Sequence, residues 1–269
     1  GAAVSNEIPG LKEVHAVDAA GVHPLLLAIG SERYTPYFTT KQPAEILTIA
    51  NHILGTGQLS LAKFVFITAD DTNQISTHRV QEYFEYILSR LDLSNDIHFY
   101  TKTTMDTLDY SGENLNSGSK LVLAAYGEVK RILAAIVPDS IQNLNADAHL
   151  IMPGVIALNA AKMNIVLLQT MFNGLGEELL ENEGVAMLIL TEDPAWMATD
   201  MQNFLWAGFT RANPSHDIDG IDAFVKNKHW GCKGPLIIDA TIKKHHAPPV
   251  VKDVAVEKRV DVILAKYGY

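Results

Sequence analysis

Apolar positions in the first half of the chain alternate between continuous runs and spaced runs. Residues 22–29 and 64–68 are continuous apolar stretches, and their length rather than their periodicity favours strands. Residues 43–54 and 79–90 repeat apolar side chains every three to four positions, which is the period of an amphipathic helix. The order strand, helix, strand, helix predicts a layered α/β domain.

The second half of the chain repeats motifs of the first half in the same order. The matched pairs, with their separations, are Thr68 with Thr191 (123), Arg90 with Arg211 (121), Asp96 with Asp217 (121) and Gly118-Ser119-Lys120 with Gly231-Cys232-Lys233 (113). One match can arise by chance, but four in the same order indicate a duplicated strand–helix–strand unit. A single unit would leave an apolar sheet face open. Two units can close it by packing on one another or by joining their strands in one sheet.

We therefore predict an α/β fold, a layered mixed sheet flanked by helices that is built from two related strand–helix–strand units. The first unit is expected at residues 1–134, the second at 151–252 and a C-terminal helix at 253–269. Pro, Asp and Asn recur over residues 135–150, so this segment is predicted to be the connecting loop. The C-terminal helix needs a surface to pack on, because its apolar side chains gather on one side, at Val256, Val260, Ile263 and Leu264.

Composition narrows the classes of protein that fit. The only cysteine, Cys232, allows no internal disulfide, so a reducing compartment and hence the cytoplasm is expected. The net charge is −10 without a basic block, which argues against nucleic acid as a partner. No apolar run approaches the ~20 residues of a membrane span, so no integral membrane segment is expected. Gly1 has no methionine before it, as in a domain taken from a longer protein.

Charged residues recur at equivalent places in the two halves, and each has a structural and a functional interpretation. Acidic pairs follow strand ends, at Asp70-Asp71 and at Glu192-Asp193. They can bind a ligand at the carboxyl ends of the strands, but helix capping alone would also account for them. Arg90 and Arg211 end helices, and an ion pair to Asp96 or Asp217 is expected to fasten the loop that follows.

The most unusual segment is His229-Trp230-Gly231-Cys232-Lys233-Gly234-Pro235. Its glycines and proline bracket an ammonium group that can face an anion or the edge of a flavin, although a tight turn before a strand is the simpler interpretation. His245-His246 lies in an apparent exposed turn, and its spacing to His229 and Cys232 fits no zinc pattern, so no metal ligand is assigned. Phosphate-binding, serine-hydrolase and zincin motifs are absent.

These motifs together resemble the UbiD family, the polyprenyl-4-hydroxybenzoate carboxy-lyases and their relatives. Ala20-Gly21-Val22-His23 followed by a strand and Arg33-Tyr34 is similar to the segment that enters the C-terminal domain of that family. Residues 204–211 are similar to its helix ending in Thr-Arg, and Pro214-Ser215-His216-Asp217 to its Asp-Pro-x-x-Asp run. Gly231-Cys232-Lys233 with Asp239-Ala240-Thr241 is similar to its Gly-Ser-Lys and Asp-Ala-Thr strand. The duplication suggests an extended branch of the family.

The resemblance implies a decarboxylase of aromatic or α,β-unsaturated acids, in quinone biosynthesis for some members, that uses prenylated FMN, a divalent metal such as manganese, and potassium. Its catalytic and metal-binding residues lie in a preceding flavin-binding domain that has no counterpart here. No catalytic residue is therefore assigned, this part alone is expected to be inactive and to bind none of these cofactors, and that missing domain is the expected partner. Lys233 is the candidate cofactor-binding residue, over the cofactor side of the cleft.

The same resemblance implies that the domain covers the active-site cleft and forms a homo-oligomer, with its terminal helix reaching a neighbour. Two other functions fit the residues. The duplicated motifs also suit a non-catalytic assembly module, and the acidic strand-end turns suit a small-molecule-binding protein.

Overall fold

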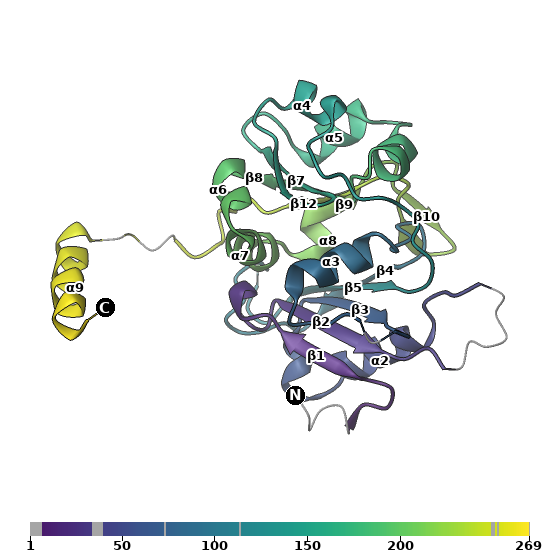
Figure 1. The fold of residues 1–269 in the computed structure, drawn as a ribbon, viewed down its shortest axis with the longest axis horizontal. Coiled ribbons are helices and arrows are strands. Elements are labelled where there is room, and N and C mark those ends of the chain that lie inside the picture. Colours follow the sequence, from purple (N-terminus) through teal and green to yellow (C-terminus); the bar gives the residue numbers. More distant parts are fainter. Residues whose placement is uncertain are drawn as a thin grey trace.

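The computed structural model describes residues 7–33, 40–72, 74–112, 114–248, 251 and 253–268. Within these ranges the strands form two five-stranded mixed sheets and one two-stranded hairpin, stacked with helices between and around them (Figure 1). This confirms the predicted α/β class. Of the Arg33-Tyr34 pair singled out above, Tyr34 lies outside the described residues.

The first sheet is assembled around the two apolar runs read from the sequence. Its strands, in spatial order, are β1 (Glu13–Ala16), β2 (Leu25–Gly30), β3 (Phe64–Ala69), β5 (Gly118–Ala125) and β4 (Ile97–Thr103). The three central strands are parallel and buried along their whole length, whereas both edge strands are antiparallel to their neighbours. Burial on both faces explains why these strands are continuous apolar runs instead of alternating ones.

The second sheet has the same order and strand directions as the first. Its strands are β6 (His149–Met152), β7 (Val155–Asn159), β8 (Met187–Thr191), β12 (Leu236–Asp239) and β9 (Ile218–Gly220). The central three are again parallel, and the two edge strands antiparallel. A separate hairpin, β10 (Phe224–Lys226) and β11 (His229–Gly231), follows β9.

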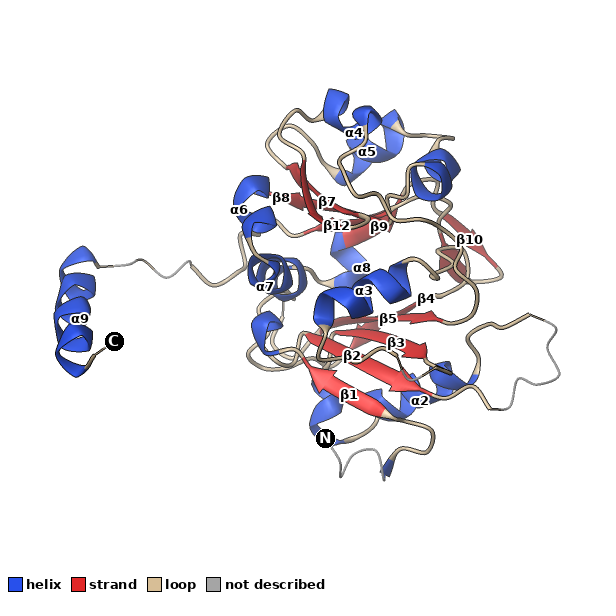
Figure 2. Cartoon of the chain, viewed as in Figure 1, coloured by secondary structure: helices blue, strands red, loops and turns tan. Residues whose placement is uncertain are grey.

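Helices separate the two sheets and cover their outer faces (Figure 2). The middle layer holds α3 (Val80–Leu88) from the first unit with α7 (Met201–Arg211) and α8 (Pro214–Asp217) from the second. The outer helices are α2 (Glu45–Leu54) on the first sheet and α4 (Asp139–Leu144) and α5 (Ile165–Met171) on the second. Shorter elements are η1 (Asp18–Ala20), η2 (Gly57–Leu61), η3 (Glu178–Asn182) and α6 (Pro194–Thr199).

The largest apolar cluster lies between the sheets and draws on both units. Phe84 of α3 and Phe209 of α7 are fully buried, with ring centroids 6.0 Å apart. Phe209 also meets Phe64 edge to face at 5.0 Å, so a helix of the second unit packs directly on a strand of the first. Each aromatic side chain of this kind buries ~150–250 Å². Of the two ways to close the open sheet faces, the chain uses packing and not a joined sheet.

Two predicted boundaries differ from the structure for identifiable reasons. The predicted connecting loop at 135–150 is not purely a loop, because Asp139–Leu144 forms α4 and β6 begins at His149. The first outer helix starts at Glu45, two residues after Pro43. The carboxylate of Glu32 accepts hydrogen bonds from the backbone N–H groups of Ala44 and Glu45, at 2.7 and 3.1 Å, and so caps the helix from a distant segment.

The predicted C-terminal helix is present as α9 (Val254–Tyr267) and stands apart from the sheets (Figure 1). Asp253 caps it by accepting from the backbone N–H groups of Ala255 and Val256, at 2.8 and 3.2 Å, and Gly268 ends it in the left-handed region at φ 83°. Every helix residue is exposed. Among the described residues, no helix is both long and apolar enough to cross a bilayer.

Candidate functional site at the junction of the two units

The first of the matched glycine–lysine loops docks on the second unit. The backbone N–H and the hydroxyl of Ser119 both donate to Oδ1 of Asn213. The Ser119 hydroxyl in turn accepts from the backbone N–H of Ser215 at 2.8 Å. Ser119 is fully buried, so this contact between β5 and the start of α8 is inaccessible to solvent.

The second loop docks on the first unit in the corresponding way. The backbone N–H of Cys232 donates to the carbonyl of Leu93 at 3.1 Å, and the Ser94 hydroxyl donates to the carbonyl of Cys232 at 3.2 Å. A side chain at Gly231 would place its Cβ 2.6 Å from the Ser94 carbonyl oxygen, so only glycine permits this approach. Ser94 and Ser215 lie 121 positions apart, the separation found for the arginine and aspartate pairs. Each unit therefore inserts its loop into the equivalent loop of the other.

The two matched lysines have different environments. Lys120 is 4% exposed, and its amine donates to the carbonyls of Ser60 and Ala62 at 2.7 and 2.8 Å. Burial lowers the pKa of this amine to about 8. The Lys233 side chain is 57% exposed and meets only Glu177, at 3.5 Å, among the described acidic residues. Lys233 is thus the matched lysine that remains free to bind another group.

Lys233 lies on the rim of a cavity of about 440 Å³ between the units. Its lining carries both signs of charge and consists of Asp92, Leu93, Ser94, Lys130, Arg131, Glu177, Leu180, Glu181, Cys232 and Lys233. Arg131 is 4% exposed and anchors the cavity wall, because it donates to the Leu88 carbonyl at 2.7 Å and pairs with Glu181 at 2.9 Å. A mixed lining of this kind favours a polar, charged ligand or protein surface over an apolar one.

The expected ion pairs between the matched arginines and aspartates are wrong. The Arg90 guanidinium stacks on the Tyr86 ring at 3.7 Å, and Arg211 meets Glu192 at 3.3 Å. Each aspartate instead accepts from the backbone N–H four residues before it: Asp96 from Asp92 at 2.9 Å and Asp217 from Asn213 at 2.7 Å. The aspartates are architectural, as the duplication suggested, but they close turns instead of pairing with arginine.

The carboxylates of the acidic strand-end turns accept hydrogen bonds from groups of the chain itself. Asp70 accepts from the backbone N–H groups of Thr72 and Ile75 at 2.8 and 3.0 Å. Asp71 accepts from Lys41 at 2.8 Å and from the Tyr126 hydroxyl at 2.6 Å, which together hold the pKa of its carboxyl below the ordinary value. In the second unit, Asp193 caps α6 by accepting from the Trp196 backbone N–H at 2.9 Å.

The Glu192 carboxylate completes this set by accepting from the backbone N–H of Ile242 at 2.7 Å, besides its contact with Arg211. All four strand-end acids thus have intramolecular partners that account for their positions. The structural interpretation of these turns is the one that the contacts favour.

Sequence reasoning missed a buried ion pair of the first unit whose lysine also contacts the second unit. Lys63 is fully buried and meets Asp109 at 2.8 Å, and its amine donates to the Thr210 carbonyl at 3.1 Å. Burial lowers the pKa of the Lys63 amine despite the attraction of Asp109. A single lysine before a strand, as in the sequence at Lys63, does not indicate that its side chain will be buried in an ion pair. Removing one partner of such a pair would leave an uncompensated buried charge.

His245 and His246 lie close to this ion pair. His245 meets the Ser111 carbonyl through Nε2 at 3.2 Å, and burial lowers the pKa of His246 to about 4. In the part of the chain that the structure describes, no group of three or more His, Cys, Asp or Glu side chains is placed to hold a metal ion.

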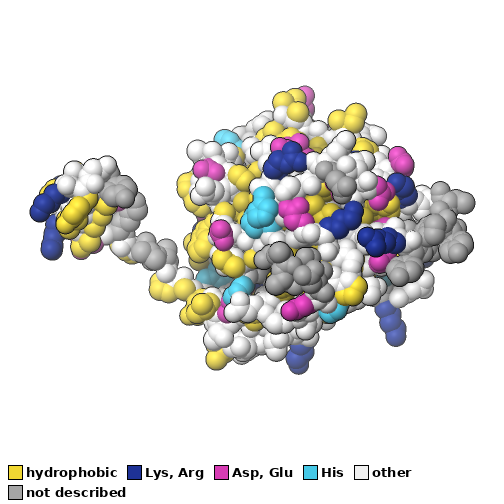
Figure 3. All heavy atoms as spheres, turned by 60° about the horizontal axis from the view of Figure 1, so that its bottom comes forward, with side chains coloured by type: hydrophobic (Ala, Val, Ile, Leu, Met, Phe, Trp, Pro, Cys, Tyr) yellow, Lys and Arg dark blue, Asp and Glu magenta, His cyan; other side chains and the backbone are white. Residues whose placement is uncertain are grey.

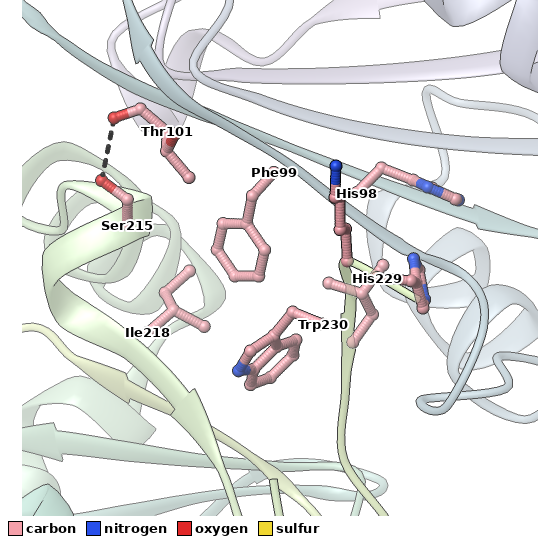
Figure 4. Close-up of a pocket in the computed structure, with 9 residues that line it drawn as sticks. His98, Phe99, Thr101, Ser215, Ile218, His229 and Trp230 are labelled. Atoms are coloured by element: carbon pink, nitrogen blue, oxygen red, sulfur yellow. Dashed lines mark hydrogen bonds between the residues drawn. The ribbon is translucent and has the colours of Figure 1, made fainter. Parts of the chain in front are cut away.

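A second cavity, of about 320 Å³, lies between β4 and the β10–β11 hairpin (Figure 4). Phe99 and Trp230 meet edge to face at 5.2 Å and point into it, while His98 and His229 lie beside one another at its margin. The predicted turn at 229–235 is therefore partly a strand, since His229–Gly231 pairs with Phe224–Lys226. This cavity joins residues 131 positions apart, which explains why sequence reasoning did not find it.

Comparison with protein families supports the resemblance for the first unit, whereas the motifs at 204–211, 214–217 and 231–241 lie outside the stretch that the family model matches. Residues 1–125 match the family model of the 3-octaprenyl-4-hydroxybenzoate carboxy-lyase C-terminal domain, the UbiD C-terminal domain. This stretch contains the Ala20-Gly21-Val22-His23 segment and the Gly118-Ser119-Lys120 loop.

Curated relatives extend the likeness across both units. An uncharacterised protein of Chlamydia muridarum is 29% identical over 264 residues, which are 97% of this chain and 42% of that protein. A protein of Chlamydia pneumoniae, named as one of the subunits of 4-hydroxybenzoate decarboxylase, is 28% identical over 257 residues, 94% of this chain and 40% of that protein. The chain thus spans about two fifths of the length of these relatives.

Among solved structures, the UbiD-class enzyme HmfF from Pelotomaculum thermopropionicum, in complex with FMN, overlaps 46% of this chain and 24% of its own, with 16% identity and a TM-score of 0.36. The vanillic acid decarboxylase of Sedimentibacter hydroxybenzoicus in its closed form overlaps 52% of this chain and 28% of its own, with 16% identity and a TM-score of 0.38.

Proposed function

We propose that this chain, which is related to the UbiD family through the C-terminal domain of that family, is the active-site-covering and oligomerisation part of a prenylated-FMN-dependent decarboxylase. The substrate would be an aromatic or unsaturated carboxylic acid, with quinone biosynthesis as the candidate pathway. The family-model match over residues 1–125 carries this proposal. A relative named as part of a decarboxylase, matched over 94% of this chain, supports it.

Lys233 is the residue of this chain that we assign to the cofactor side. Its exposed ammonium suits an anionic group such as a flavin phosphate, whereas the amine of Lys120 is occupied by two carbonyls. When bound, the prenylated flavin supplies the electron sink for decarboxylation. As the family resemblance implies, we assign the manganese and potassium ions to a flavin-binding domain outside this chain.

We further infer that the two units arose by internal duplication. Their sheets share strand order and strand directions, and their glycine–lysine loops dock reciprocally. In the second unit the loop has retained an exposed lysine, and in the first unit the equivalent lysine has become part of the interior. Duplication followed by such divergence would leave one copy for structure and one for the cofactor cleft.

The C-terminal helix supports the assembly role, and also the alternative of a non-catalytic assembly module. Its apolar stripe remains uncovered, with Val256 52%, Val260 44% and Leu264 43% exposed. Hydrophobic side chains also gather on the body where the chain leaves for α9 (Figure 3). Trp206 of α7 is 52% exposed and lies against Gly21. We assign the stripe to contact with a second copy of the chain.

The decarboxylase assignment is tested on the full-length protein that contains this chain, produced together with a flavin prenyltransferase. Carbon dioxide release is measured over a panel of aromatic and unsaturated carboxylic acids. We expect turnover with at least one acid, and a lower flavin content or a higher KM in the Lys233→Ala variant. Lys226→Ala, which removes an exposed lysine from the hairpin, is the matched control and should behave as wild type. A full-length protein that binds no flavin would overturn the assignment.

The assembly role is tested separately by measuring molar mass in solution. Deleting residues 254–269 or introducing Val260→Asp with Leu264→Asp should lower the mass of the oligomer. Val262→Asp alters the opposite side of α9, where the side chain is 72% exposed, and should leave the mass unchanged. If the truncated chain keeps both the mass and the melting temperature of the intact chain, α9 has no role in assembly.

A further inference from the structure

Two histidines from different units bring their imidazole rings together at the margin of the aromatic cavity. His98 lies on the edge strand β4, and His229 begins β11. Their ring centroids are 5.5 Å apart with the planes inclined at 55° (Figure 4). Nε2 of each ring is buried and has no hydrogen-bond partner among the described residues. A buried polar atom without a partner costs ~1–3 kcal/mol, so two such nitrogens on neighbouring rings mark a place where a ligand can bind.

We propose that His98 and His229 bind one divalent transition-metal ion of the zinc, cobalt or nickel type through their Nε2 atoms. Neutral imidazole is the commonest protein ligand for these ions. Burial, together with the neighbouring His229, lowers the pKa of His98, which keeps that ring in the neutral form that coordinates metal.

The spacing of the rings agrees with a shared ion. With Zn–N distances of ~2.0–2.1 Å, each ring centre lies ~3 Å from the metal, so two rings on one tetrahedral ion have centroids ~5 Å apart. The observed separation is 5.5 Å. The inclined planes also exclude a parallel ring stack as the reason for the contact.

The site would keep open coordination positions. No third His, Cys, Asp or Glu completes a cluster in the described ranges, so water or an external donor must supply the remaining ligands. The adjoining cavity of about 320 Å³, with the hydroxyl side chains of Thr101 and Ser215 in its lining, has room for such donors. Imidazole ligands suit zinc, nickel and copper, whereas oxygen ligands suit manganese, so this ion is different from the one assigned to the missing domain.

A metal at this position would tie the two units together. His98 belongs to the first sheet and His229 to the hairpin of the second unit, and β11 packs on β4. A metal ion that binds the folded chain but not the unfolded chain stabilises the folded state by mass action. The melting temperature should therefore rise with metal concentration.

The chain contains a matched histidine pair for comparison. His15 and His78 have ring centroids 4.3 Å apart, closer than the proposed ligands. Nδ1 of His15 is hydrogen-bonded to the Thr77 carbonyl at 2.9 Å, and neither ring is among those with a buried unpartnered nitrogen. Both histidine pairs therefore have neighbouring rings. Of these two pairs, only His98 and His229 have buried nitrogens without a hydrogen-bond partner.

The test uses the 269-residue chain after removal of metal with EDTA. Zn²⁺ binding is measured by calorimetry and Co²⁺ binding by visible absorption. We expect one ion per chain, a rise in melting temperature, and loss of affinity by at least about tenfold in both His98→Gln and His229→Gln. His78→Gln should bind as wild type. Melting curves in EDTA establish that each variant is folded before its affinity is compared.

Two results would overturn the proposal. Unchanged affinity in either His98→Gln or His229→Gln would place the ion elsewhere. The absence of binding by the folded wild-type chain would mean that the two buried nitrogens do not form a metal site. Neither result bears on the decarboxylase assignment, since that assignment is judged by flavin content and turnover in the full-length protein.

Discussion

The matched loops Gly118-Ser119-Lys120 and Gly231-Cys232-Lys233 have similar sequences and different environments. In the first, serine and lysine are both buried, and their polar side chains are bonded within the protein interior. In the second, the thiol is buried but the lysine is exposed. The backbone contacts of the two loops are reciprocal, so the shared residues maintain the joint between units. The two loops differ in their lysines: Lys233 is exposed and can bind another group, whereas Lys120 is buried.

The largest expected effect is the pH dependence of stability that Asp96 of the first unit contributes. Burial raises the pKa of Asp96 to about 7 from an ordinary value of 3.8. Between these values the unfolded chain releases a proton that the folded chain retains, so stability falls as pH rises from ~4 to ~7, by roughly 4 kcal/mol from this group. Asp96→Asn still accepts the Asp92 N–H but should remove this fall. Urea unfolding at pH 4, 5.5 and 7 measures it.

A variant whose pH dependence over that window equals that of wild type would show that Asp96 is ionised in the folded chain. Asp217→Asn, measured in the same way, removes the equivalent turn-closing carboxylate of the second unit and serves as the matched comparison.

A smaller effect is expected at the glycines that begin the two loops. A Cβ at Gly231 would lie 2.6 Å from the Ser94 carbonyl oxygen. This oxygen belongs to the backbone, so it could move away only by disrupting the contact between the two units. A Cβ at Gly118 would meet the Met105 sulfur at 2.1 Å, but that side chain can rotate. Gly231→Ala should therefore cost about 3 kcal/mol and Gly118→Ala about 1 kcal/mol of unfolding free energy. Equal losses would mean that the docking of the second loop is not tight.

Exchanging the middle residues tests whether the loops have diverged irreversibly. Ser119→Cys removes a hydroxyl that bonds Asn213 and accepts from Ser215, and should cost about 2 kcal/mol. Cys232→Ser places a hydroxyl near the Gly234 carbonyl, which the thiol reaches at 3.3 Å, and should cost less than about 1 kcal/mol. Thermal melting of both variants gives the comparison. A larger loss in Cys232→Ser than in Ser119→Cys would contradict the hydrogen-bond roles of these two side chains.

The smallest effect concerns thiol chemistry and leaves stability unchanged. Cys232 is fully buried, and burial raises the pKa of its thiol far above the ordinary value. A thiol-reactive dye should leave the native chain unlabelled and label one thiol per chain after denaturation. Rapid labelling of the native chain would mean that the joint between Cys232 and Ser94 opens in solution.

Much of the fold follows from local patterns, whereas the joint between units does not. The apolar runs at 22–29 and 64–68 correspond to β2 and β3, and the C-terminal helix predicted at 253–269 corresponds to α9, because apolar runs and helical periods are local properties of the sequence. The expected ion pairs of Arg90 and Arg211 failed because backbone N–H groups compete for the same carboxylates.

The candidate sites depend on contacts that a single sequence does not encode locally. Lys63 meets a carbonyl 147 positions away, and His98 meets a ring 131 positions away. The duplication pointed to equivalent positions but not to which of the two lysines would be buried. That outcome is set by the carbonyls of Ser60 and Ala62, which have no counterpart in the motif.

The most direct measurement is the absorbance spectrum above 300 nm of the 269-residue chain and of the full-length protein, each purified after co-expression with a flavin prenyltransferase. We predict a colourless chain and a full-length protein that carries stoichiometric flavin. A colourless full-length protein would contradict the decarboxylase assignment. A chain that carries flavin by itself would contradict the proposed placement of the cofactor site outside this chain, and would move it to the cavity beside Lys233.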